Sequence, residues 1–177
     1  EWTDCERILA GAFKPVERLQ WLRQTLFSRA GGLTLGRGSL DITNQTNHQL
    51  LDSPVRSEQI NQIGLPENLR WAAGPAEFIS LNVSGSQYGL AGSIAPAIMA
   101  AQARANLRWL EQAVERANIN QRSALVIALH AEFRARKLHH LDSASNPVNP
   151  KRPYGWLRSA LHKAVCQFGG TVIVLHG

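Results

Sequence analysis

The stretch that decides the fold is Ser123-Ala124-Leu125-Val126-Ile127-Ala128-Leu129-His130. It is apolar up to Leu129 and ends abruptly in a histidine. A continuous apolar run of this length is typical of a strand buried on both faces of a parallel sheet. Ligands of such sheets bind just beyond the carboxyl ends of the strands. The sequence therefore predicts a central strand that places His130 at a functional edge.

A second run, residues 171–177, repeats this pattern and also ends in a histidine, His176, before Gly177. The residues between the runs include an amphipathic segment, 155–168, with apolar side chains at helical spacing. Strands joined by a helical crossover usually pair in parallel. We therefore expect residues 124–129 and 171–176 to be neighbouring central strands, with the helix covering one face of the sheet.

The residues before the first run supply the remaining elements. An apolar stripe predicts a helix over 101–117, and turn residues at 73–75 predict a hairpin between 69–71 and 77–83. The final hundred residues thus follow a βαβαβ pattern, which places the chain in the α/β class. Closer to the start, Pro15 favours a helix that continues to about Ser28. The Asn- and Gln-rich residues 44–49 are expected to form a surface loop.

Composition sets wider limits on function. The chain has 177 residues, which suits a single domain, and a net charge of +6. A basic balance fits either a solvated surface or attraction of phosphates or nucleic acid, although no Lys/Arg run is dense enough to mark a nucleic-acid stripe. No apolar run is long enough for a membrane helix. Cys5 and Cys166 leave open one disulfide or two buried thiols.

Both ends of the sequence suggest a piece of a larger domain. The last predicted strand stops at Gly177, although the loop after a strand end is where chemistry is expected. At the other end, Glu1 stands in front of a helix without the strand that normally opens an α/β domain. We therefore expect residues 1–177 to be a single, incomplete domain.

Several short stretches resemble one protein family. The opening Glu1-Trp2-Thr3-Asp4-Cys5 is similar to a motif in a bacterial branch of the calcineurin-like metallophosphoesterases, where it follows a Gly-Asp-Asn triplet. Further similar stretches, all in the family's order, are residues 66–71, 78–86, 109–110, 126–131 and 172–177. The resemblance thus covers nearly the whole chain.

The resemblance implies a fold and a chemistry. The family's fold is a pair of mixed sheets flanked by helices, and two divalent metal ions (Mn, Fe, Zn or Ni) activate a water that attacks a phosphoester. His130 corresponds to the family's lone histidine ligand at the end of a central strand. Gly177 corresponds to the glycine that opens the last ligand motif, whereas the other ligand motifs have no counterpart here.

The resemblance therefore implies a segment of a metal-dependent phosphoester hydrolase that is inactive on its own. The alternative is a binding or scaffold protein that keeps the phosphoesterase architecture without its metals. A basic module that binds nucleic acid is a further alternative. The cellular compartment is left open: the protein is either periplasmic or secreted in a bacterium, or cytoplasmic.

Two residues are carried forward as site candidates. His130 is the expected metal ligand, with a hydrogen-bonded core histidine as the alternative. Asn82, at the end of its predicted strand, is expected to contact the phosphoester substrate or else to form a strand-end turn. The pair His139-His140 is either a metal site or a solvated loop. We expect His176 to be a partly buried neighbour of the site and His162 to lie on the surface.

Overall fold

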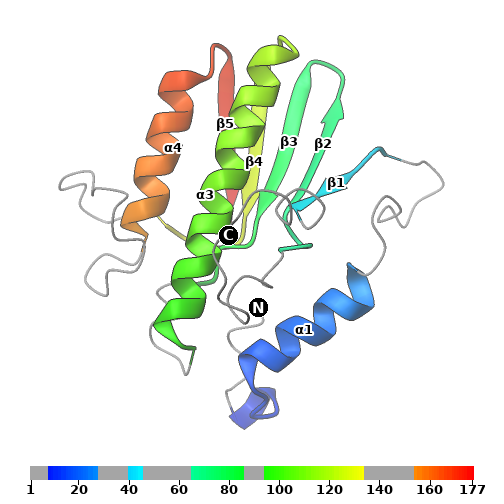
Figure 1. Cartoon of the computed structure of the whole chain (residues 1–177), viewed down its shortest axis with the longest axis vertical. Coiled ribbons are helices and arrows are strands. Elements are labelled where there is room, and N and C mark those ends of the chain that lie inside the picture. Colours follow the sequence, from blue (N-terminus) through cyan, green and yellow to red (C-terminus); the bar gives the residue numbers. More distant parts are fainter. Residues whose placement is uncertain (1–7, 28–39, 46–64, 86–93, 134–153) are drawn as a thin grey trace, which may run out of the picture.

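In a computed structural model of the chain, the described residues are 8–27, 40–45, 65–85, 94–133 and 154–177. Together they form three α-helices, one short 3-10 helix and one five-stranded mixed sheet (Figure 1). The α/β class and the β-α-β crossovers of the C-terminal half are as predicted. Residues 1–7 and 134–153, which hold Cys5 and the pair His139-His140, lie outside the described residues.

The sheet has the strand order β1-β2-β3-β4-β5. Its strands are β1 (Thr43–Asn44), β2 (Leu69–Ala73), β3 (Ala76–Leu81), β4 (Ala124–Leu129) and β5 (Thr171–His176). The first three strands pair antiparallel, whereas β3, β4 and β5 are parallel. The carboxyl ends of these three parallel strands therefore meet at one edge of the sheet.

The predicted hairpin is confirmed as β2 and β3. Gly74 and Pro75 form its tight turn, and Gly74 has a φ of +54°, a left-handed conformation that glycine adopts without a steric penalty. Across the two strands, the rings of Trp71 and Phe78 stack with centroids 5.3 Å apart. Such aromatic cross-strand pairs help to fix the register of a hairpin.

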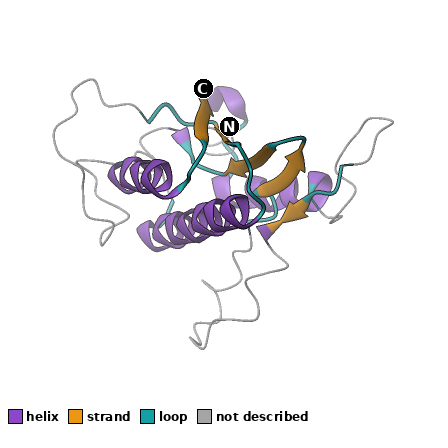
Figure 2. Cartoon of the chain, turned by 90° about the horizontal axis from the view of Figure 1, so that it is seen from above, coloured by secondary structure: helices purple, strands orange, loops and turns teal. Residues whose placement is uncertain are grey.

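Two helices pack on one face of the sheet. They are α3 (Pro96–Ile119) and α4 (Gly155–Gln167), and they lie side by side on the same face (Figure 2). Helix α3 is longer than predicted because Pro96 begins it, at a position where the missing N–H has no cost. The core between the layers holds Ile79 and Leu81 of β3, Leu125, Ile127 and Leu129 of β4, and Trp109, Ala113, Leu157 and Leu161 of the helices.

The prediction that residues 171–176 form a central strand is wrong. Within the described part of the chain, β5 is the edge strand beyond β4, although it pairs in parallel with β4 as expected. Val172 and Val174 pack against the core, whereas Ile173 is 43% exposed and Leu175 is 55% exposed. The reason is that no strand of the described residues pairs with the other side of β5, and its alternate side chains point to the face that α3 and α4 do not cover.

That other face carries an apolar row. Trp71, Phe78, Val126 and Ile173 lie in register on four successive strands, on the side of the sheet away from α3 and α4. Phe78 and Trp71 are partly buried, and Val126 is 9% exposed.

The N-terminal helix α1 (Pro15–Leu26) begins at the proline that predicted it. It lies near the carboxyl edge of the sheet (Figure 1), where Leu19 joins the core and Leu22 packs against it. A 3-10 helix, Ile8–Ala10, precedes it. No helix of the described residues is long and apolar enough to cross a membrane.

Two further predictions need correction. Asn44 and Gln45, expected in a surface loop, are 4% and 0% exposed, and hydrogen bonds satisfy both ends of the Gln45 amide inside the protein; residues 46–49 lie outside the described residues. Cys166 is a free thiol on the exposed side of α4, so it is neither buried nor part of a disulfide.

Candidate functional site

The two candidate residues from the sequence follow adjacent parallel strands. Asn82 comes directly after Leu81 of β3, and His130 comes directly after Leu129 of β4, and these two leucines are register partners. The carbonyl oxygen of His130 accepts a hydrogen bond of 3.2 Å from the N–H of Gly177, which follows β5. His130 itself is exposed. The fold therefore brings Asn82, His130 and Gly177 to the same edge.

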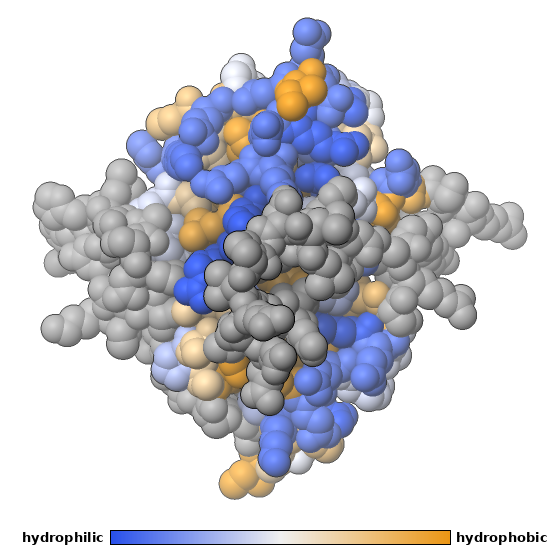
Figure 3. Space-filling view, viewed as in Figure 1, coloured by the Kyte–Doolittle hydropathy of each residue, from blue (hydrophilic) through white to orange (hydrophobic). Residues whose placement is uncertain are grey.

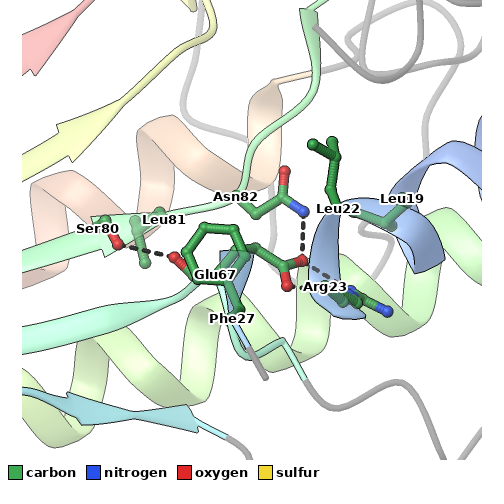
Figure 4. A pocket seen from close by; sticks show the side chains of 8 residues that line it. All are labelled: Leu19, Leu22, Arg23, Phe27, Glu67, Ser80, Leu81 and Asn82. Atoms are coloured by element: carbon green, nitrogen blue, oxygen red, sulfur yellow. Dashed lines mark hydrogen bonds and ion pairs between the residues drawn. The ribbon is translucent and has the colours of Figure 1, made fainter. Parts of the chain in front are cut away.

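Asn82 lines a pocket of about 200 Å³ beside helix α1. Its amide nitrogen donates a hydrogen bond of 2.6 Å to the Glu67 carboxylate, and Arg23 donates two more, of 2.7 and 2.9 Å, to the same group (Figure 4). Most of the other lining side chains are apolar: Leu19, Leu22, Phe27 and Leu81. The charge of Glu67 is thus neutralised inside the pocket, and its carboxylate fixes the direction of the Asn82 amide.

A buried amide network holds Asn82 from the other side. The amide nitrogen of Asn68 donates to the side-chain oxygens of Gln45 and Asn106, each at 2.7 Å, and its oxygen accepts the Asn82 N–H at 2.6 Å. Asn106 in turn donates to the carbonyl of Asn82 at 2.8 Å, and Gln45 donates to the carbonyl of Ala105 in α3. Gln45, Asn68 and Asn106 are fully buried. The strand end that carries Asn82 is therefore tied to α3 by side-chain hydrogen bonds.

Two other histidines of the described residues, His176 and His162, lie where the sequence placed them. The side chain of His176 is 15% exposed, and its Nδ1 is 3.6 Å from the Glu132 carboxylate. Its ring lies edge-on to the ring of Phe133, with the two centroids 5.1 Å apart. It is a partly buried neighbour of the edge, as predicted. His162 is exposed on α4, as predicted.

The described residues do not by themselves fit a two-metal centre. Among them there is no group of three or more His, Cys, Asp or Glu side chains arranged to hold a metal ion. A pair of metal ions needs several oxygen and imidazole donors in addition to one histidine. His130 has the donor type of a ligand, but the side chains around it in the described chain do not complete a coordination shell.

Sequence reasoning missed the residues that anchor this edge. Arg23 and Glu67 are 44 positions apart, and Asn68 reaches Gln45 and Asn106 across 23 and 38 positions. No local spacing predicts such contacts. The polar composition of residues 44–49 and 66–68 was the only hint, because polar side chains next to predicted strands need hydrogen-bond partners when buried.

Comparison with known proteins adds no assignment. No family model, no curated protein and no solved structure matches the chain. The likeness to calcineurin-like phosphoesterases therefore depends on the sequence motifs alone, and the function drawn from it is a proposal.

Proposed function

We propose that the chain is a segment of a metal-dependent phosphoester hydrolase with the calcineurin-like sandwich fold, in which two divalent ions activate a water. The observation that carries the proposal is the position of His130 beside Asn82, at the carboxyl ends of two parallel strands in register. In open α/β sheets this edge is where ligands bind. The motifs that resemble the family along the chain support the same function.

The chain's own residues contribute orientation in this proposal. The backbone of His130 is fixed by β4 and by the hydrogen bond from Gly177, so the imidazole starts from a constrained position. The side chain of Asn82 is directed by Glu67, and its backbone is held by Asn68 and Asn106. The donors among the described residues do not complete a metal site, so the contribution of these residues is to orient the side chain of Asn82 and the backbone of His130.

One observation favours the alternative of a non-catalytic scaffold. The amide of Asn82 already donates to Glu67, which is also bound twice by Arg23. A side chain engaged in this way can serve to close the strand end rather than to hold a substrate. In the scaffold, His130 is a surface histidine without a chemical role.

The experiment compares His130→Ala with His162→Ala in the intact parent protein. If His130 is a metal ligand, His130→Ala should lose both bound metal and aryl-phosphate turnover. Its melting temperature should change little, because His130 is exposed. His162→Ala, an exposed histidine on α4, should change none of the three.

Two results would overturn the proposal. Full metal content and full turnover in His130→Ala would remove the residue from the site. A parent protein that neither binds divalent metal nor hydrolyses phosphoesters would favour the scaffold. The 177-residue chain alone should show little turnover, and robust metal-dependent hydrolysis by it would refute the description of the chain as an inactive segment.

A further inference from the structure

A cluster of buried charges surrounds Glu77, near the amino ends of the parallel strands β3 and β4. The Glu77 carboxylate is 1% exposed and lies near the Nε atoms of three arginines: Arg116 at 3.3 Å, Arg122 at 3.7 Å and Arg70 at 3.8 Å. Three positive charges thus face one negative charge. This cluster is at the end of the strands opposite to His130 and Asn82.

The cluster is not satisfied by its own members. Neither carboxylate oxygen of Glu77 accepts a hydrogen bond, and the Nε atoms of Arg70 and Arg122 donate none. Arg70 is 6% exposed, and its guanidinium lies over the ring of Trp109 at 4.5 Å. Burial and the charge of Arg116 lower the pKa of Arg70, and Glu77 compensates only in part. The positive charge at this place is therefore in excess.

A pocket of about 330 Å³ opens onto this excess charge. It is lined by Arg70 from β2, by Gln112, Glu115, Arg116 and Ile119 from the C-terminal half of α3, and by Asn120, which caps that helix. In Figure 3, most of the surface at the end of the molecule where α3 ends is hydrophilic, with a few hydrophobic side chains among it. Glu115 is exposed, so water screens its charge more strongly than the charge of Arg70, which is buried.

The end of a helix carries a partial negative charge that opposes anion binding. In α3 this effect is reduced, because the last carbonyls already accept hydrogen bonds. The backbone N–H and the side-chain amide of Asn120 both donate to the carbonyl of Arg116 at 2.9 Å, and the N–H of Arg122 donates to Ala117 at 2.8 Å. The guanidinium groups therefore dominate the local field.

We propose that this pocket binds a small phosphorylated anion, with the phosphoryl group between the guanidinium groups of Arg70 and Arg116 and within reach of the Gln112 amide. Planar guanidinium forks match phosphate oxygens and form charge-assisted hydrogen bonds with them. A bound dianion would offset the excess positive charge around Glu77 and supply an acceptor to Arg70, whose Nε has none. The ligand is either free phosphate or the phosphate group of a small monoester.

The test is calorimetric titration of the 177-residue protein with inorganic phosphate and with phenyl phosphate, at constant ionic strength. Replacing the buried Arg70 risks unfolding, so the variant is Arg116→Gln, whose side chain is 50% exposed. The control is Arg108→Gln, an exposed arginine on the same helix outside the pocket. We expect Arg116→Gln to weaken phosphate binding about tenfold, the cost of one charge-assisted hydrogen bond. Arg108→Gln and His130→Ala should leave the affinity unchanged.

Every outcome has a meaning for the proposal. Tighter binding of inorganic phosphate identifies free phosphate as the ligand, tighter binding of phenyl phosphate identifies a monoester, and equal affinity shows that the phosphoryl group alone is recognised. Each of these results supports the pocket if Arg116→Gln weakens binding. The proposal is overturned if no saturable binding occurs in the millimolar range or if Arg116→Gln leaves the phosphate affinity unchanged. It is also overturned if Arg108→Gln weakens binding as much as Arg116→Gln, since general charge attraction would then explain the effect, or if His130→Ala abolishes binding.

Discussion

Replacing Asn68 by alanine tests the network that holds the candidate edge. The substitution removes three side-chain hydrogen bonds of 2.6 to 2.7 Å and leaves the oxygens of Gln45 and Asn106 and the N–H of Asn82 without that partner. A buried hydrogen bond contributes about 1 kcal/mol net, and each polar group left unsatisfied adds further cost. The free energy of unfolding should therefore fall by about 4 kcal/mol, a large part of the roughly 5–15 kcal/mol typical of a domain.

The assay is urea unfolding followed by tryptophan fluorescence and circular dichroism. With a slope of about 2 kcal/mol per molar urea, the midpoint should fall by about 2 M. The melting temperature should fall by about 8 to 16 °C for a chain of this size. The matched control is Asn118→Ala, because the side chain of Asn118 is exposed and makes long hydrogen bonds, of 3.0 and 3.4 Å, to the backbone of Gln167 and Gly169. Its cost should be about 0.5 kcal/mol.

The reasoning is refuted if Asn68→Ala and Asn118→Ala destabilise the protein equally. It also fails if Asn68→Ala costs less than about 1 kcal/mol, since a fully buried amide would then contribute no more than a single net hydrogen bond.

Two further substitutions test the packing of the fold, each with a control. In Gly170→Ala, the new methyl group would collide with the carbonyl oxygen of Ser123, which should lower the free energy of unfolding by about 2 kcal/mol. In Gly169→Ala the new methyl group meets no atom within 4 Å, so this control should melt at nearly the temperature of the unchanged protein. Equal costs would contradict the close approach of β5 to the chain before β4. Arg23→Ala should cost about 2 kcal/mol because it leaves a largely buried carboxylate without its cation. Lys163→Ala breaks an exposed ion pair and should lower the free energy of unfolding by less than about 0.5 kcal/mol in the same chemical denaturation. A larger loss for Lys163→Ala than for Arg23→Ala would refute the view that the buried ion pair matters more than the exposed one.

The sequence predicted the parts of the fold that depend on local patterns. Pro15 marked the start of α1, the apolar runs marked β4 and β5, and Gly74 and Pro75 marked the hairpin turn. These features follow from backbone sterics and from periodic burial, both of which act over a few residues.

The errors have a common physical cause. Whether a strand is central or at an edge depends on what lies beside it, and the apolar run of β5 does not contain that information. In the same way, the burial of Gln45 depends on Asn68 and Ala105, which are distant in sequence. The placement of His130 and Asn82 was predictable because strand ends converge, whereas the support of Asn82 by Glu67 was not.

The apolar row formed by Trp71, Phe78, Val126 and Ile173 has a consequence for how the chain behaves at high concentration. It lies on the side of the sheet away from α3 and α4, next to a strand that has a neighbour on one side only within the described residues. Ile173 at the end of this row and Leu175 on the same strand are 43% and 55% exposed, and exposed apolar side chains at the edge of a sheet promote association between molecules. During refolding, first-order folding of one chain should therefore compete with second-order association between chains. The yield of monomer should fall as the protein concentration is raised.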